Sequence, residues 1–193
     1  IIINNYKVND TDYTILPNES KCFLISLDIL FICFPNDTIL NFKNIFSNFN
    51  ILINQIICSS YAKSMNYKKN LNLTGNTSFI DIGFNKTAII SFHNDKLLFI
   101  DTLPIGGNQI TKDISKILNV GLEEAEAIKI NTIKNIGNKN NTRFSNIRIE
   151  KIILARIEEI LELSIKSIES NSFKSNLFRI FLTGNGSKIL NND

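Results

Sequence analysis

The sequence predicts an α/β protein in which a small α+β part, residues 1–70, precedes a larger part with a sheet and several helices, residues 71–193. Residues 77–129 carry the main signal, because β-branched and aromatic runs are followed there by apolar positions at helical spacing. Residues 150–170 have the periodicity of a long amphipathic helix. With 193 residues, of which 44% are hydrophobic and 20% charged, the chain is long enough to bury a core.

The first part contains few motifs. Residues 1–20 are mostly polar, and residues 22–34 are apolar but too short to cross a bilayer, which favours a buried strand. Asn36 and Asp37 are suitable N-caps for a helix over residues 36–49 whose apolar face would pack on a sheet. We expect a strand over residues 51–58, a short helix over 59–65 and a linker over 68–76.

Charge and cysteine usage narrow the class of protein. The net charge is +3, and no basic run or basic stripe with interleaved aromatic residues is present, so no nucleic-acid partner is expected. Cys22, Cys33 and Cys58 are odd in number and lie in apolar segments without C-x-x-C spacing. Buried, reduced thiols in a reducing cytoplasm are the expectation. His93, the single histidine, has no nominated partner and receives no catalytic role.

The larger part begins with three predicted strands. Residues 78–83 and 87–92 suit adjacent strands joined by a tight turn, which places Asp81 and Gly83 at a strand end. A third strand, residues 96–103, ends at Pro104 because proline cannot donate to a strand ladder.

Two predicted helices follow. Gly106 and Gly107 open the first, and backbone N–H groups at such a helix start favour an anion. Its apolar positions are Ile110, Ile114, Ile117 and Leu118. Gly121 precedes the second, on which Glu126 and Lys129 are three residues apart and therefore share a face.

The C-terminal third contains one strongly predicted helix and one strand. Residues 130–148 are asparagine-rich, and the helix over 150–170 follows them. Its predicted core stripe consists of Ile153, Ile157, Ile160, Leu161, Ile165 and Ile168. Residues 177–182 read as a strand that runs into the glycine turn 183–187, where small residues let backbone amides approach a ligand.

Three of these segments resemble motifs of the FtsA family of bacterial actin-like cell-division proteins. They are DIGFNKTAI (residues 81–89), against the family's DIGGGTTDI-type turn, LPIGGNQITKDI (103–114) and EEAEAIK (123–129). A weaker resemblance covers residues 21–187, and TGNGS (183–187) resembles the adenosine motif TGGG(S/A) with Asn185 for its middle glycine.

The resemblance implies an actin-like ATPase fold, with residues 71–193 forming the second-lobe core around a ribonuclease-H-like sheet. Residues 1–70 would be the family's extra subdomain, of the SHS2 type, which supports self-association and contacts with later division proteins. Residues 130–149 would be either a shortened version of the subdomain that docks the tail of the tubulin-like protein FtsZ, or a loop in its place.

The resemblance also implies a site for ATP with magnesium. Asp81 would hold the metal through water, Gly83, Gly106 and Gly107 would approach the phosphates, and Glu126 and Lys129 would reach the ribose and base. The full implied set is Asp81, Gly83, Thr87, Gly106, Gly107, Asn108, Glu126, Lys129, Gly184, Asn185, Gly186 and Ser187.

The phosphate turn departs from the family pattern. Phe84, Asn85 and Lys86 follow Gly83, and Ala88 stands at the place of the motif's acidic residue. A bulky ring where backbone should meet phosphate is a steric obstacle. We therefore expect weak or lost ATP binding, little or no hydrolysis, and a protein that is not an enzyme.

The function implied is a scaffold on the cytoplasmic side of the cell membrane at the division site, with FtsZ, later division proteins and a second copy as partners. Membrane contact would come only through a terminal helix absent from this chain, which begins with isoleucine and is expected to be a fragment. The alternatives are an actin-superfamily ATPase or kinase, favoured by an intact phosphate turn, and a pilus-assembly or microcompartment relative of the same fold.

Overall fold

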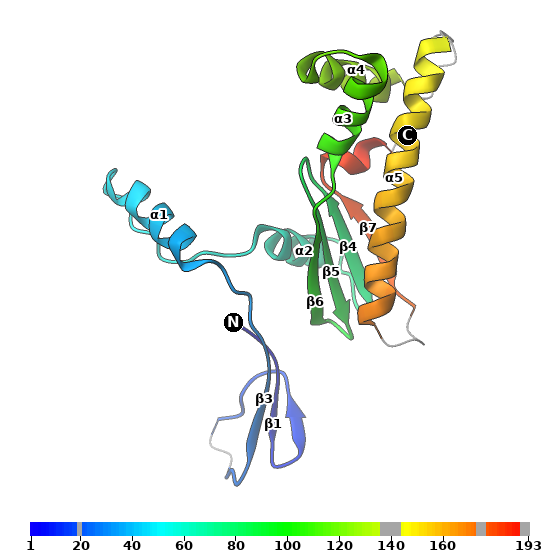
Figure 1. Cartoon of the computed structure of the whole chain (residues 1–193). Helices are drawn as coiled ribbons and strands as arrows, with labels where there is room; N and C mark the ends of the chain where they lie inside the picture. The colour runs from blue at the N-terminus through cyan, green and yellow to red at the C-terminus, as the bar shows by residue number, and fades with distance from the viewer. Residues whose placement is uncertain (19–20, 136–143, 173–176, 190–193) are drawn as a thin grey trace. The chain divides into compact units, whose positions relative to one another are not determined.

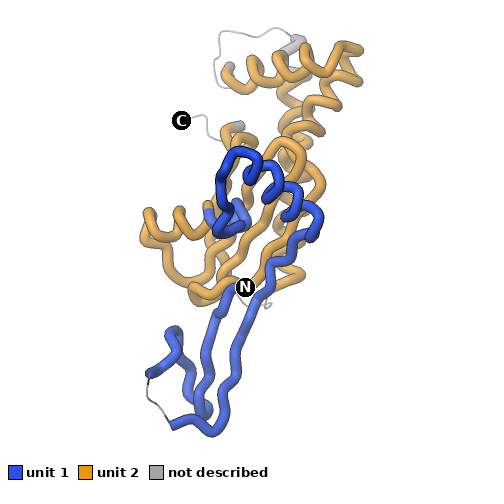
Figure 2. The backbone as a smooth tube through the Cα atoms, turned by 90° about the vertical axis from the view of Figure 1, so that its left-hand side faces the viewer, with its two compact units in different colours: residues 1–62 blue, residues 63–193 orange. Residues whose placement is uncertain are grey.

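The structure is a computed structural model that describes residues 1–18, 21–135, 144–172 and 177–189. The chain divides into two compact units, Ile1–Ala62 and Lys63–Asp193 (Figure 2). The division lies inside helix α2 (Ser59–Asn70), whereas the sequence led us to expect it after residue 70. Each unit is described by itself.

The first unit contains a three-stranded antiparallel sheet in the order β2-β1-β3, formed by β1 (Ile2–Val8), β2 (Thr11–Tyr13) and β3 (Ile25–Leu30). The turn between β1 and β2 is Asn9-Asp10, with φ of 47° and 68°. Asparagine and aspartate tolerate this left-handed region, which a two-residue hairpin needs. The same pair of angles recurs at Asn94-Asp95 between two later strands. Neither β1 nor β2 was predicted.

Three expectations for this unit were wrong. β3 is shorter than the predicted strand and mostly exposed, because it is an edge strand of a small sheet. Residues 51–58 form no strand, since an apolar run becomes one only where another strand pairs with it. Cys22 and Cys33 are exposed, and Cys58 is half-buried, although all three are free thiols as expected.

Helix α1 (Asn36–Ser47) forms where the sequence predicts a helix, but two details differ. Pro35 is the N-cap residue and no side chain caps the helix, so Asn36 and Asp37 are not caps. Proline is suited to this place because its fixed φ, here −57°, is compatible with the entry to a helix. None of the helix's residues is buried, so the predicted packing of its apolar face on a sheet is not observed.

The second unit is built on a four-stranded sheet in the order β6-β5-β4-β7 (Figure 1). The strands β4 (Thr77–Ile82), β5 (Thr87–His93) and β6 (Lys96–Leu103) are antiparallel neighbours, as predicted. β7 (Arg179–Thr183) returns from the far end of the chain and pairs in parallel with β4, so that Asp81 lies opposite Thr183.

One face of this sheet is covered by α5 (Phe144–Asn171), the long helix seen beside the strands in Figure 1. The core on this side joins Ile80, Ile82 and Ile89 of the sheet to α3 (Gly107–Leu118) and α5. From the helices come Ile110, Ile114, Ile153, Ile157, Ile160 and Ile168. Ile117 and Ile165 were assigned to the core by periodicity, but they are exposed at the edges of the two apolar stripes.

The opposite face is an aromatic cluster under α2. Phe79 of β4 stacks on Phe181 of β7 and on Tyr67 of α2, with ring centroids 5.3 and 6.1 Å apart. The ammonium of Lys68, in the same helix, lies 2.9 Å from Asp95 Oδ1 and 4.8 Å from the Phe92 ring centroid. The predicted linker therefore begins inside a helix that is tied to the sheet.

Helix α4 (Leu122–Asn135) continues into the asparagine-rich stretch, and α5 begins at Phe144. The predicted loop or shortened insertion over residues 130–149 is thus helical at both ends. Its middle, residues 136–143, lies outside the described residues.

Candidate functional site

The candidate site lies where β4 and β7 end. The turn 83–86 follows β4, the start of α3 packs on that turn, and the short helix η1 (Asn185–Ile189) follows β7. Because β4 and β7 are parallel neighbours, their C-terminal ends meet at one edge of the sheet. Segments separated by a hundred residues of sequence therefore become neighbours.

The start of α3 is closed by backbone hydrogen bonds. The amide of Gly107 donates to Gly83 O at 3.0 Å, and the amide of Asn108 donates to Phe84 O at 2.7 Å. A Cβ atom at Gly106 would lie 2.6 and 2.7 Å from these two carbonyl oxygens. The amides expected to face an anion at this helix start therefore donate to carbonyl groups of the turn 83–86 in this structure.

Two further predicted residues also support this junction. Thr87 is buried, and its hydroxyl donates to Ile105 O at 2.8 Å, just before the two glycines. The Asn108 side-chain amide donates to Asn85 Oδ1 at 3.0 Å. Both side chains hold the turn and the helix start together.

Glu126 and Lys129 form a polar network with Thr111, which the sequence analysis did not single out. The Lys129 ammonium donates to Glu126 Oε2 at 2.7 Å, to Thr111 Oγ1 at 2.9 Å and to Gly107 O at 3.1 Å. An ammonium has three donors, so all three are used. The Thr111 hydroxyl also donates to Glu126. The predicted pairing of Glu126 with Lys129 on one face of α4 is therefore observed, and it joins α4 to α3.

This network makes stability depend on pH. Burial raises the pKa of Glu126, but hydrogen bonds from Lys129 and Thr111 lower it by more, so the pKa falls below its ordinary value of 4.5. A carboxylate with a depressed folded-state pKa contributes stability above its unfolded pKa and loses it as the pH falls through the folded value. We expect the melting temperature to fall less steeply below about pH 4.5 in Glu126→Gln than in the unmodified protein.

The control for this titration is Glu123→Gln, on the exposed surface of the same helix. Thermal unfolding followed by circular dichroism at a series of pH values measures both variants. Identical slopes for Glu126→Gln and the unmodified protein would contradict the prediction.

The turn after β7 lies against the end of β4. Gly184 has φ of +85°, and a Cβ atom there would lie 2.5 Å from Asp81 Oδ1. A Cβ atom at Gly186 would lie 2.3 Å from Ile82 Cγ2. Ser187 is buried and its hydroxyl donates to Gly184 O at 2.8 Å. The left-handed residue of this turn is thus Gly184, and Asn185, in place of the motif's middle glycine, starts η1 without a positive φ.

Asp81, the predicted metal-holding residue, is paired with a lysine. Its Oδ2 lies 3.0 Å from the ammonium of Lys63 in α2, and its side chain is 12% exposed. Nothing in the sequence singled out Lys63. In the described part of the chain, no three histidine, cysteine, aspartate or glutamate residues gather as a metal-holding group.

The residues present do not fit magnesium ATP as they stand. Asp81 is engaged by Lys63, the helix-start amides by the turn, and Lys129 by three acceptors. Phe84 is 55% exposed, and its ring centroid lies 5.6 Å from the Lys129 ammonium. A nucleotide would have to displace several contacts within the protein.

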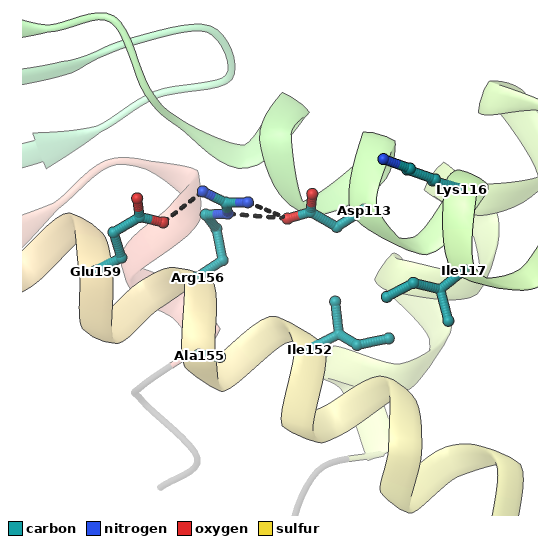
Figure 3. Close-up of a pocket in the computed structure, with 7 residues that line it drawn as sticks. All are labelled: Asp113, Lys116, Ile117, Ile152, Ala155, Arg156 and Glu159. Atoms are coloured by element: carbon teal, nitrogen blue, oxygen red, sulfur yellow. Dashed lines mark hydrogen bonds and ion pairs between the residues drawn. The ribbon is translucent and has the colours of Figure 1, made fainter.

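A separate pocket of about 600 Å³ lies between α3 and α5 (Figure 3). Ile117, Ile152 and Ala155 form its apolar part, and Asp113, Lys116, Arg156 and Glu159 its charged part. The Arg156 guanidinium binds Asp113 Oδ2 through Nε at 2.9 Å and Nη2 at 2.7 Å, and it also pairs with Glu159. Arg156 lies outside the predicted core stripe of its helix, and its partner on α3 could not be foreseen from the sequence.

This pairing should tie the two helices together. We expect the double-mutant cycle of Arg156→Met and Asp113→Asn to give a coupling energy of about 1 kcal/mol, since the contact is two-pronged but partly exposed. Urea unfolding of the four proteins of the cycle measures it. The same cycle on Lys166 and Glu162, an exposed pair on α5, should give a smaller value. Equal coupling in the two cycles would contradict a role for the pocket pair in holding α3 to α5.

Comparison with known proteins places the second unit in a family. The profile of the family "Cell division protein FtsA" matches residues 78–191, more than half of the chain. FtsA of Bacillus subtilis (strain 168) is 35% identical over 108 residues, which cover 48% of this chain and 24% of that protein. FtsA of Neisseria meningitidis serogroup B is 31% identical over 122 residues, which cover 54% and 30%. The chain thus matches only about a quarter to a third of the length of these relatives.

A solved structure agrees on the fold. The PilM-PilN type IV pilus biogenesis complex superposes with a TM-score of 0.58 at 20% identity, covering 73% of this chain and 38% of that chain. The predicted α/β, actin-like fold is therefore confirmed. No helix in the described part of the chain is both long enough and apolar enough to cross a membrane. The motifs, the fold and the family profile together show that the chain belongs to the FtsA family of cell-division proteins.

Proposed function

We propose that this chain is part of a cell-division scaffold that links FtsZ filaments to the inner face of the cytoplasmic membrane and recruits later division proteins. The observation that carries the proposal is the family match over residues 78–191, which covers the four-stranded sheet and the helices around its core. FtsZ, a second copy and later division proteins are the proposed partners, and the division site is the proposed location.

Exposed apolar side chains in the first unit support an interaction role for it. Because none of the residues of α1 is buried, its large apolar side chains are available to a partner. They are Leu40, Phe42, Ile45 and Phe46. We propose that this unit contributes to self-association and to contacts with other division proteins.

The nucleotide is proposed to bind weakly or not at all. The actin-like fold is in general a nucleotide-binding fold, which supports ATP with magnesium as the ligand of the ancestral site. Against tight binding stand the engaged Asp81, the Phe84 ring and the amides already used by the turn. Hydrolysis also needs a positioned water or base besides a metal, and Ala88 supplies neither.

Two experiments test the proposal. Co-sedimentation of the purified protein with FtsZ filaments should bring it into the pellet, and deletion of its gene should disturb septation. Absence from the pellet together with normal septation would overturn the scaffold role. ATP turnover that Asp81→Asn abolishes would instead support the actin-superfamily ATPase.

A further inference from the structure

We propose that the ammonium of Lys63 takes the place of the divalent cation at Asp81, so that a residue of the same chain balances the negative charge of the candidate site. The inference deepens the proposed function, because it explains how this scaffold could dispense with a metal at the end of β4. It concerns only contacts within the second unit, Lys63–Asp193.

One carboxylate oxygen of Asp81 lies against the turn after β7, and the other is paired with Lys63. Asp81 Oδ1 lies beside Gly184, at the point where a Cβ atom would come within 2.5 Å. Oδ2 faces Lys63 Nζ at 3.0 Å. The Asp81 side chain is 12% exposed, whereas the Lys63 side chain is 56% exposed. A carboxylate so nearly buried needs an opposite charge, and the lysine supplies one.

Among the residues that the structure describes, Asp81 belongs to no group of three or more histidine, cysteine, aspartate or glutamate side chains that would attract a metal against this lysine. In the ladders of the sheet, Asp81 lies directly opposite Ala88 on one side and Thr183 on the other. Ala88 is buried and uncharged. The pair of one carboxylate and one ammonium is neutral. A divalent cation that approached Asp81 would be repelled by the Lys63 ammonium, which lies 3.0 Å from the carboxylate. The cation must displace Lys63 before it can bind.

A second lysine of the candidate site, Lys129, is likewise paired with groups of its own chain. The Lys129 ammonium is buried, gives all its donors to Glu126, Thr111 and Gly107, and lies under the Phe84 ring. This network shares no residue with the Lys63–Asp81 pair. Two lysines, Lys63 and Lys129, therefore neutralise Asp81 and Glu126 of the candidate site from within the protein.

Magnesium chloride alone, without nucleotide, is the probe for this proposal. The melting temperature of the purified protein is measured against increasing magnesium chloride, with sodium chloride at matched ionic strength as the reference, because salt weakens a half-exposed pair by itself. We expect no specific magnesium effect on the unmodified protein. Lys63→Met should melt at a lower temperature and regain stability with magnesium.

In Lys63→Met, the half-saturating magnesium concentration should be at least about tenfold lower than the highest concentration at which the unmodified protein still shows no response, since no ammonium has to be displaced. The added change Asp81→Asn should abolish this response. Lys63→Arg keeps the charge and should behave as the unmodified protein does. Lys69→Met, an exposed lysine of the same helix, is the matched control and should gain no magnesium response.

Several outcomes would overturn the proposal. Magnesium stabilisation of the unmodified protein that Asp81→Asn removes would show that Lys63 does not exclude the metal, and this arm is decisive even if Lys63→Met does not fold. A response of Lys63→Arg equal to that of Lys63→Met would do the same. Loss of FtsZ co-sedimentation with an unchanged magnesium result would count against the proposed function and leave this inference standing.

Discussion

Phe79→Ala is expected to lower the free energy of unfolding by about 3–5 kcal/mol, the largest single effect among the changes considered for this protein. Phe79 is 1% exposed and lies at the centre of the aromatic cluster, where it contacts Tyr67, Phe92 and Phe181. Removing its ring leaves a cavity between β4, β7 and α2, and the rigid sheet cannot collapse to fill it.

Urea unfolding followed by circular dichroism measures this loss. The matched control is Phe84→Ala, because Phe84 is also an aromatic residue of the second unit but is mostly exposed. Its loss should be at most about 1 kcal/mol, the worth of an exposed cation–π contact with Lys129. Similar losses in the two variants would contradict the buried position of Phe79.

Gly106→Ala is expected to cost about 1–3 kcal/mol or more, because the added methyl group would overlap backbone atoms that cannot move independently. The backbone at Gly106 is extended, with φ of −167°, so any residue could adopt it. The cost in stability therefore comes from steric overlap and not from backbone strain. The new Cβ atom would push the start of α3 away from the carbonyl oxygens of Gly83 and Phe84.

Gly121→Ala provides the control for this effect. A Cβ atom at Gly121 meets nothing within 4 Å, and this glycine has no left-handed φ. The change should be neutral or should stabilise by up to about 1 kcal/mol through the unfolded state. If both alanine variants have the same stability, the close junction between the turn and α3 is not present in solution.

Patterns among residues that are close together in the sequence predicted much of the second unit. Apolar runs with β-branched and aromatic residues marked β4, β5 and β6, Pro104 marked the end of β6, and the isoleucine spacing marked α3 and α5. The motifs also indicated the family and the group of residues around Asp81, Gly107 and Lys129. These features depend on neighbours in the sequence, which is why they could be read from it.

The first unit was predicted less well, for a physical reason. A short strand such as β1 becomes a strand only when another strand pairs with it, and residues 51–58 lack such a partner in spite of a strand-like composition. Burial of a side chain likewise depends on residues that are distant in the sequence. β3 and the cysteines were expected inside because they are apolar, but a three-stranded sheet cannot cover them.

The sequence alone therefore determined the family, the order of the main elements and the residues of the candidate site, because motifs and periodicity are properties of the chain itself. Only the tertiary structure decided what those residues do to one another. It brought Lys63 to Asp81, Thr111 to Lys129 and Arg156 to Asp113, and it turned the helix-start amides onto the turn. Charge pairing and hydrogen bonding act through space, so their partners are set by how the sheet and helices pack.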